Sequence, residues 1–222
     1  MPPLRRHINL SYMERKDKGI LIAFEGIDGA GKTTQVELLT DFLDSVGQPV
    51  VRSKEPTEGP WGQLIRQWAR NGRSTLDEEV NAFVKDREEH VREVILPALA
   101  KGKIVLLDRY FYSTIAYQGA RSGDIDSITS KMLDISPEPD AVVLIDVPPE
   151  LGLARIEQGR GEKPNAFEKK GTLEQVRDVF LQLARQRPNI ILIDGTPSIE
   201  VVRRAILESL LKGVLRRYNA TP

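Results

Sequence analysis

The sequence of 222 residues contains no cysteine, which excludes disulfide bonds, thiol nucleophiles and thiolate metal sites. It also lacks a net charge, because 32 Lys and Arg residues balance 32 Asp and Glu residues, so no overall basic field favours a nucleic-acid polymer. Apolar runs such as 141–145 and 190–193 are far shorter than the about 20 residues of a membrane-spanning helix. These absences predict a cytoplasmic protein with neither nucleic-acid nor membrane partners.

Short apolar segments alternate with stretches of helical periodicity along most of the chain. This alternation is typical of a parallel, doubly wound sheet, so we predict an α/β fold with a five-stranded parallel sheet and helices on both faces. The predicted strands are residues 20–24, 50–51, 104–107, 141–146 and 190–193. We expect one domain over residues 19–213, a lid at about 158–171, and loosely ordered tails at 1–18 and 214–222.

Three local patterns predict where helices begin and end. Thr75 and Glu78 form a capping box that opens a long helix, and Pro97 is expected to kink or end it. Thr172 with Gln175 is expected to start a further helix that runs to about residue 187.

The most informative stretch is residues 25–34, Glu-Gly-Ile-Asp-Gly-Ala-Gly-Lys-Thr-Thr, between a predicted strand and a predicted helix. It matches the P-loop pattern, in which backbone N–H groups bind phosphate, the lysine reaches the terminal phosphates and the hydroxyl binds Mg²⁺. We therefore predict binding of a nucleoside triphosphate. The residues predicted to bind ATP are Gly26, Ile27, Asp28, Gly29, Ala30, Gly31, Lys32, Thr33 and Thr34.

Other P-loop classes fit the sequence less well. A regulatory GTPase needs a guanine-reading Asn-Lys-x-Asp segment, which is absent, and no apolar run ends in the paired acids usual in motor ATPases. A small-molecule kinase needs a second set of cations, because it must bring two polyanions together. The candidates for that set are Lys54, Arg66, Arg87, Arg109 and Arg160.

Several blocks in the same order resemble bacterial thymidylate kinases: residues 24–35, 86–91, 108–119 and 146–155, within a resemblance that spans about 19–211. The resemblance implies the P-loop nucleoside monophosphate kinase fold and transfer of the γ-phosphoryl group of ATP to dTMP, giving dTDP. It also implies Mg²⁺ and a homodimer. A kinase of another or broader set of nucleoside monophosphates, and a degenerate homologue that binds nucleotides without turnover, are the alternatives.

The resemblance also assigns residues to the acceptor site. It implies that Asp28 contacts the 3′-hydroxyl of the sugar, and that the segment with Tyr110, Thr114, Tyr117 and Gln118 reads the base edge and crowds the 2′ position. Arg109 follows a strand end, where its guanidinium could grip the acceptor phosphate with two donors. The predicted acceptor residues are Asp28, Lys54, Phe83, Arg87, Arg109, Thr114, Tyr117 and Gln118.

Phe83 and Arg87 lie four residues apart, so they share one helix face, where an aromatic ring could stack on a base and a guanidinium could reach its carbonyl. The resemblance gives them that role. Periodicity alone would make Phe83 a core residue and Arg87 a partner of Glu88 or Glu89.

The metal site is predicted from strand ends. Asp108 ends a buried strand, and with Thr33 it is the preferred magnesium ligand, although Asp146 and Asp194 also end strands.

Three departures from the family pattern affect the predicted cations. Lys54 stands where relatives usually carry Arg, Asn165-Ala166 replaces an Asp-Arg pair in the lid, and Gly29 stands where some relatives carry Arg. The catalytic cations are therefore predicted to be Lys32, Arg109 and Arg160. Arg155 and Lys163 are the next candidates for the lid cation, and a solvated loop charge is the alternative for Arg160.

Overall fold

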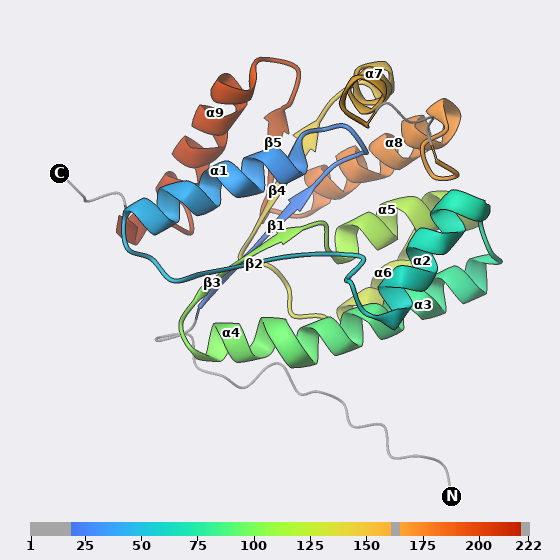
Figure 1. Ribbon diagram of the computed structural model, residues 1–222, viewed down its shortest axis with the longest axis horizontal. Coiled ribbons are helices and arrows are strands. Elements are labelled where there is room, and N and C mark those ends of the chain that lie inside the picture. Colours follow the sequence, from blue (N-terminus) through green and yellow to red (C-terminus); the bar gives the residue numbers. More distant parts are fainter. Residues whose placement is uncertain (1–18, 161–164, 219–222) are drawn as a thin grey trace, which may run out of the picture.

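The computed structural model describes residues 19–160 and 165–218, and a five-stranded sheet forms its centre (Figure 1). Neighbouring strands are all parallel, in the order β2-β3-β1-β4-β5. The strands are β1 (Ile20–Glu25), β2 (Val50–Lys54), β3 (Ile104–Asp108), β4 (Ala141–Asp146) and β5 (Ile190–Asp194). The predicted α/β fold is confirmed, and β1, β2, β3 and β5 extend slightly beyond their predicted ends.

The strand sequences follow from their place in the sheet. β1 is the middle strand and every one of its residues is buried, whereas most positions of the edge strands β2 and β5 are partly or fully exposed. A parallel strand covered on both faces reads as a continuous apolar run rather than an alternating one. This is why the central strands were recognisable from composition alone.

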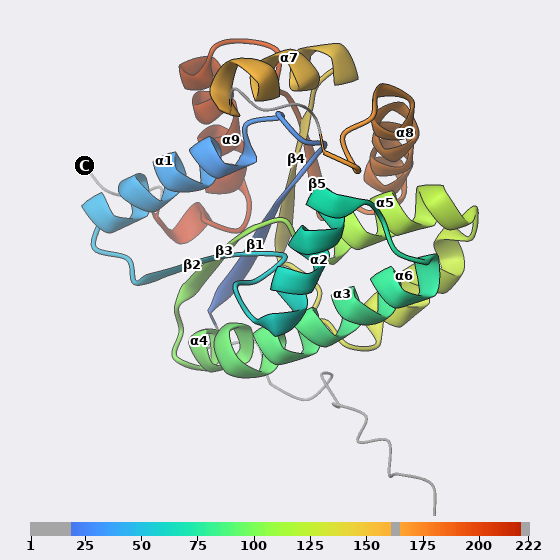
Figure 2. The ribbon, with the colours of Figure 1, turned by 45° about the vertical axis from the view of Figure 1, so that its right-hand side comes forward.

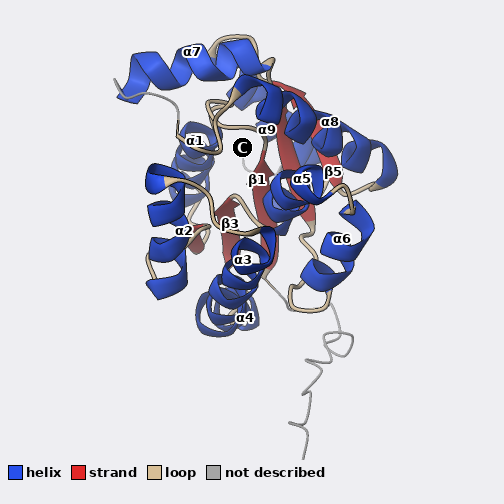
Figure 3. Ribbon diagram, turned by 90° about the vertical axis from the view of Figure 1, so that its right-hand side faces the viewer, coloured by secondary structure: helices blue, strands red, loops and turns tan. Residues whose placement is uncertain are grey.

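Helices cover both faces of the sheet, as Figures 2 and 3 show from two further directions. The helices are α1 (Lys32–Ser45), α2 (Pro60–Asn71), α3 (Leu76–His90), α4 (Leu96–Ala100), α5 (Phe111–Ser122), α6 (Ile125–Leu133), α7 (Pro149–Arg160), α8 (Lys170–Gln186) and α9 (Ile199–Lys212). α1 and α9 pack together on one face, while α4 and α8 contact the other. None of the described helices is long and apolar enough to cross a membrane.

The helix from α3 to α4 differs from its prediction in one respect. The capping box is confirmed, since Glu78 N–H donates to Thr75 Oγ1 at 3.3 Å and Thr75 N–H donates to Glu78 Oε2 at 3.2 Å. The chain stays helical through Pro97, with a π-helical segment, Val91–Ile95, joining α3 to α4. There the N–H of Leu96 bonds to the carbonyl of Val91, five residues back. This widened turn gives the proline ring room. Of the two expected outcomes at Pro97, the end of the helix is contradicted, whereas the kink stays a prediction.

Two further boundaries are corrected. α8 begins at Lys170 rather than at Thr172, because the turn that precedes it already directs Leu173 N–H to the carbonyl of Lys169. At the other end, Leu215 is fully buried in the core and a short 3₁₀ helix, Arg216–Tyr218, follows, so residues 214–218 belong to the domain. The predicted tail at 1–18 and the candidate cation Lys163 lie outside the described residues.

The carboxyl ends of neighbouring strands lie along one edge of the sheet. Register pairs Phe24 with Asp108 and Lys54 with the same Asp108, while Glu25 lies beside Leu144 two residues before the end of β4. The loops after β1, β2, β3 and β4 therefore meet along one edge of the sheet, where open α/β folds bind ligands.

Replacing Thr75 by Ala should lower the free energy of unfolding by about 1 kcal/mol, because it removes the acceptor for the first turn of α3. Urea unfolding should show a lower midpoint with an unchanged m-value.

Thr40→Ala is the matched control, because Thr40 lies inside α1 and its hydroxyl donates to the Val36 carbonyl one turn back rather than capping the helix. It should change the unfolding free energy by less than about 0.5 kcal/mol. An equal loss in both variants would contradict a special role for the cap.

Candidate active site

The glycine-rich loop, residues 26–31, connects β1 to α1 and is shaped for an anion. Gly26 and Gly31 have φ values of 137° and 95°, and a Cβ at Gly26 would overlap the carbonyl oxygen of Ile145. α1 has neither a side-chain cap nor an acid in its first turn. The free N–H groups and the positive end of the helix are therefore available to phosphate oxygens.

Lys32 is held against this loop. Its side chain is buried, and Nζ donates to the carbonyls of Gly26 at 3.1 Å and Ile27 at 2.8 Å. Burial, together with the nearby guanidinium of Arg109, lowers the pKa of Lys32 to about 8. An added phosphate would favour the charged form again, so this lysine is poised to respond to an anion.

Asp28 lies inside the loop and is paired on two sides. Arg109 Nη2 lies 2.7 Å from its Oδ1, and the Tyr117 hydroxyl donates to its Oδ2 at 2.7 Å. Burial alone would raise the pKa of Asp28, but the charges of Arg109 and Lys32 outweigh it and lower the pKa to about 2. Asp28 is therefore a fixed carboxylate in a neutralised setting, not a solvated loop acid.

Arg109 adopts an uncommon backbone conformation, with φ at 68°, directly after β3. Besides Asp28, its guanidinium donates to the Gly26 carbonyl at 3.2 Å and to the Ser113 hydroxyl at 2.9 Å. A non-glycine residue in this region persists only where surrounding contacts impose it, and such residues cluster at functional sites.

Glu25, at the end of β1, is buried beneath the same cluster. Its Oε1 accepts the N–H groups of Tyr110 at 2.9 Å and Ser113 at 3.2 Å, and its Oε2 accepts the Ser113 hydroxyl at 2.5 Å. Burial outweighs these contacts and raises the pKa of Glu25 to about 7. The carboxylate thereby fixes the start of α5 to the end of β1.

The preferred magnesium ligands are adjacent. The Thr33 hydroxyl lies 2.5 Å from Asp108 Oδ2. The alternatives are engaged elsewhere, since Arg177 holds Asp146 with contacts of 2.6 and 2.8 Å and Thr196 donates twice to Asp194. Across the described residues no three His, Cys, Asp or Glu side chains could hold a metal by themselves. A hydroxyl and one carboxylate fit Mg²⁺ that takes its other oxygens from phosphate and water.

Every predicted acceptor residue except Lys54 lines one cavity of about 240 Å³, called here the inner cavity: Asp28, Phe83, Arg87, Arg109, Thr114, Tyr117 and Gln118. It is smaller than the roughly 300–1,000 Å³ of sites that enclose a whole ligand, so it suits part of one. Asp28 and Arg109 form its boundary with the glycine-rich loop.

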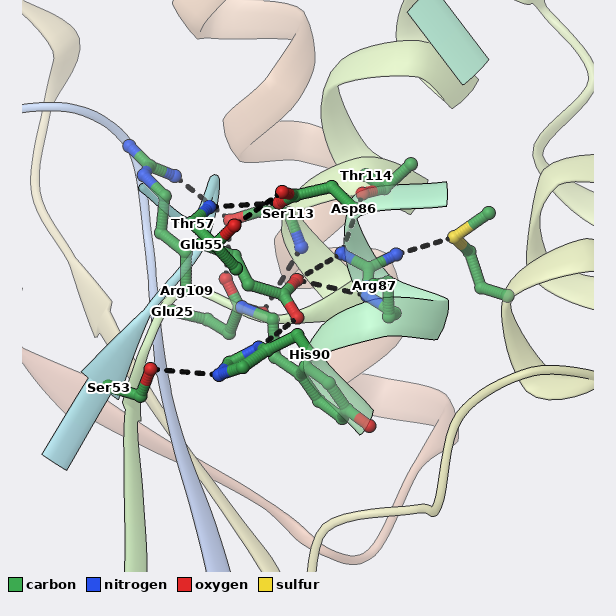
Figure 4. A network of polar contacts seen from close by, with 12 residues as sticks. Glu25, Ser53, Glu55, Thr57, Asp86, Arg87, His90, Arg109, Ser113 and Thr114 are labelled. Atoms are coloured by element: carbon green, nitrogen blue, oxygen red, sulfur yellow. Dashed lines mark hydrogen bonds and ion pairs between the residues drawn. The ribbon is translucent and has the colours of Figure 1, made fainter. Parts of the chain in front are cut away.

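Arg87 takes part in a buried network at the wall of this cavity, drawn in Figure 4. It is almost fully buried, and its Nε and Nη2 lie 3.0 and 2.5 Å from Glu55 Oε2. Nη2 also donates to the Thr114 hydroxyl at 3.0 Å, and Nη1 lies 2.7 Å from the sulfur of Met132. The partner of Arg87 is therefore Glu55, and the interpretation based on Glu88 or Glu89 is wrong.

Lys54 does not reach the inner cavity. It pairs with Glu58 at 2.8 Å and lines a wider cavity of about 600 Å³, together with Thr33 and Asp108. Lys54 thus lies in the same cavity as the predicted magnesium ligands, apart from the other predicted acceptor residues.

No role was predicted for three residues that shape the site: Glu55, Asp86 and His90. Glu55 bonds Arg87 and, through Oε1, His90 Nδ1 at 2.9 Å, and the other ring nitrogen of His90 lies 2.8 Å from Ser53 Oγ. Asp86 accepts the Thr57 N–H and hydroxyl at 2.9 and 2.6 Å. The spacing of Asp86, Arg87 and His90 on one helix was the available signal, but their partners lie about 30 residues away in the chain.

Comparisons with known proteins agree with this geometry. The family model described as thymidylate kinase matches residues 24–206. The chain belongs to the thymidylate kinase family. A thymidylate kinase of Xanthomonas oryzae pv. oryzae (strain PXO99A) is 47% identical over 192 residues, covering 86% of this chain and 83% of the relative. One from Xylella fastidiosa (strain M12) is 46% identical over 198 residues, covering 89% of each.

Part of the lid of this family member lies against the inner cavity. Ala166 N–H donates to the Ala69 carbonyl of α2 at 3.0 Å, and Phe167 is buried, with its ring centroid 6.5 Å from that of Tyr117. Asn165 and Phe167 both line the cavity. Residues of the predicted lid that stand where relatives carry the Asp-Arg pair therefore lie against the inner cavity.

The candidate lid cations are placed only in part. Arg155 donates to the Gly195 carbonyl at 3.0 Å, which directs it toward the end of β5. Arg160 is the last residue of α7 and not a loop residue, and its side chain lies outside the described atoms. At Gly29, a Cβ would overlap the carbonyl oxygen of Gly152 in α7, so this family member has no room there for the arginine of some relatives.

The stability of wild type relative to Glu25→Gln should fall as pH rises from about 4.5 to 7, by up to about 3 kcal/mol. The folded protein binds the Glu25 proton more tightly than the unfolded chain, so this contribution is complete below pH 4.5 and lost above pH 7. Urea unfolding of both proteins across this range measures the difference, in which other titrating groups cancel. Parallel pH profiles would contradict the raised pKa.

Proposed function

We propose that this protein transfers the γ-phosphoryl group of ATP to dTMP, forming dTDP. The observation that carries the proposal is the boundary at Asp28 and Arg109, where the glycine-rich loop meets the inner cavity. A donor phosphate on the loop and an acceptor in the cavity would meet there. The names of the relatives supply the choice of dTMP.

The inner cavity suits a pyrimidine nucleotide in several respects. Phe83 offers a flat apolar surface, while Arg87, Thr114 and Gln118 offer polar groups at the buried end. Asp28, paired with Arg109 and Tyr117, is placed to accept a hydrogen bond from a sugar hydroxyl. Arg109 then lies between the sugar and the loop, where the acceptor phosphate would sit.

The donor side would bind ATP through the glycine-rich loop, Lys32 and the first turn of α1. Thr33 and Asp108 would hold Mg²⁺, which when bound neutralises charge on the phosphates. Lys32 and Arg109 would stabilise the charge that develops on the transferred group. No general base is needed, because the acceptor phosphate is already an anionic nucleophile.

Three further features belong to this proposal. Arg160, at the end of α7, is the proposed lid cation that takes the place of the family's lid arginine. The enzyme is proposed to act as a homodimer in the cytoplasm. Phosphorylation of another or a broader set of nucleoside monophosphates is the second candidate function, favoured by the altered lid and by Lys54.

A coupled assay of ADP release tests the choice of acceptor. With ATP and Mg²⁺, kcat/KM for dTMP should exceed the values for dUMP, dCMP, dGMP and UMP. A preference for another acceptor would support the second candidate. Binding of ATP without ADP release from any acceptor would identify a degenerate homologue.

Lys32→Ala should lower turnover at least about a hundredfold, because the transition state loses a positioned cation. Lys101→Ala, which removes an exposed lysine after α4, should leave turnover unchanged. Near-normal turnover of Lys32→Ala, in a protein that unfolds like wild type, would overturn the assignment of the glycine-rich loop as the donor site.

Phe83→Ala should raise the KM for dTMP about tenfold and leave the KM for ATP nearly unchanged, since stacking of an aromatic ring on a base contributes on the order of 1–3 kcal/mol. This substitution is cleaner than Arg87→Ala, which would leave Glu55 buried without its cation.

Trp61→Ala is the control, because Trp61 stacks with Lys85 and does not line the inner cavity. A shift confined to ATP in Phe83→Ala would place the acceptor elsewhere.

A further inference from the structure

Glu79 is a fully buried carboxylate on α3 that the proposed reaction does not use. Arg73, in the loop between α2 and α3, contacts both of its oxygens, with Nε and Nη2 at 3.0 and 2.6 Å. Arg121, at the end of α5, lies 2.9 Å from Oε1. Two guanidinium groups thus share one carboxylate, so this cluster of three side chains retains one positive charge.

The guanidinium of Arg73 also faces an aromatic ring of the lid. Its central carbon lies 4.4 Å from the centroid of the Phe167 ring. A cation over an aromatic ring is attracted by the negative charge density of the ring face. Because a guanidinium is planar, it can stack on the ring while its N–H groups keep their contacts with a carboxylate. The paired contact with Glu79 therefore holds Arg73 in the orientation that the ring requires.

The lid segment 165–168 is a short turn that is braced from within. Phe167 N–H donates to Asn165 Oδ1 at 2.8 Å. Ala166 N–H donates to the Ala69 carbonyl at 3.0 Å. Ala69 lies in the last turn of α2, where carbonyl groups lack partners within the helix. The segment is thus attached to α2 by a backbone hydrogen bond and to the following loop by the ring of Phe167.

Phe167 connects this attachment to the proposed active site. It lines the inner cavity, whereas Arg73 is not among the described residues that do so. Its ring lies edge-on to Tyr117, whose hydroxyl donates to Asp28, and it is only 9% exposed. The ring therefore covers the cavity beside Asp28. Water that entered there would reach the boundary at which phosphoryl transfer is proposed.

We propose that Arg73 is a positioning residue that holds the lid segment 165–168 against the inner cavity through Phe167, and that Glu79 fixes Arg73 for this task. The held segment excludes water, so that ATP transfers its γ-phosphoryl group to the acceptor and not to water. In the competing hydrolysis, the water oxygen bonds to the γ-phosphorus, the bond to the ADP oxygen breaks, and a proton is released. The exclusion of water rests on the proposed function, whereas the attachment of the lid does not.

Hydrogen exchange of the Ala166 amide, measured by NMR without nucleotide, tests the attachment directly. This N–H exchanges when the segment leaves the Ala69 carbonyl. Arg73→Gln should speed the exchange about tenfold, since it removes the cation beside the Phe167 ring. The amides of β1 should exchange as in wild type. Exchange of Ala166 at the wild-type rate in this variant would contradict the proposal.

Arg121→Gln is the matched control, because Arg121 holds the same carboxylate but stacks on no aromatic ring in the described part of the chain. It should leave the exchange of Ala166 nearly unchanged. Equal acceleration in both variants would show that only the charge balance around Glu79 matters, and the proposal would be wrong.

Phe167→Leu provides a second route that leaves the ion cluster intact. It should speed the exchange of Ala166 as much as Arg73→Gln does. The double variant should show no further increase, because the two residues act through one contact. Additive effects of the two substitutions would also overturn the proposal.

Turnover tests the exclusion of water. The ratio of ADP released with ATP alone to ADP released with ATP and dTMP should rise about fivefold in Arg73→Gln and keep its wild-type value in Arg121→Gln. An unchanged ratio alongside faster exchange of Ala166 would contradict the exclusion of water. If wild type phosphorylates no acceptor, the proposed function fails, while the exchange of Ala166 still decides whether Arg73 holds the lid.

Discussion

The ion pair between Asp28 and Arg109 is the interaction on which the geometry of the site depends. It joins the loop after β1 to the residue after β3, and both side chains are largely buried. Removing either partner would leave an uncompensated charge, which in a buried setting commonly costs several kcal/mol. The same contact, with those to Gly26 and Ser113, holds Arg109 in its left-handed conformation. Backbone strain at one residue is thus maintained by contacts from two neighbouring elements.

Local features of the fold and site were predictable from the sequence, because the residues that create them are adjacent in the chain. The glycine-rich loop, the capping box at Thr75 and the apolar strands are of this kind. The Glu55–Arg87 pair joins residues 32 apart, so no local pattern distinguished it from a pair with a neighbouring glutamate. For Pro97 a kink or an end of the helix was predicted, but the helix continues through it by way of the π-helical segment Val91–Ile95.

Three ionisable residues at the end of β1 and in the following loop have pKa values that differ from their ordinary ones, each for its own reason. Glu25 is buried beneath the site with a raised pKa, Asp28 lies above it with a lowered one, and Lys32 has lost part of its basicity. The two carboxyl groups differ because Asp28 faces Arg109 directly, whereas Glu25 is held mainly by neutral donors. Neighbouring groups whose pKa values are shifted in opposite directions by their surroundings are typical of sites that bind or transfer charged groups.

The close contact between α7 and the glycine-rich loop limits the order in which substitutions can occur during evolution. A Cβ at Gly29 would overlap the backbone of Gly152, and a Cβ at Gly152 would overlap the carbonyl oxygen of Asp28, so neither position tolerates a side chain while the facing backbone stays in place. A lineage could not acquire an arginine at position 29 in one step. The backbone of α7 at Gly152 would first have to move away from the loop. The order in which substitutions are permitted is therefore set by a backbone contact that involves no charge.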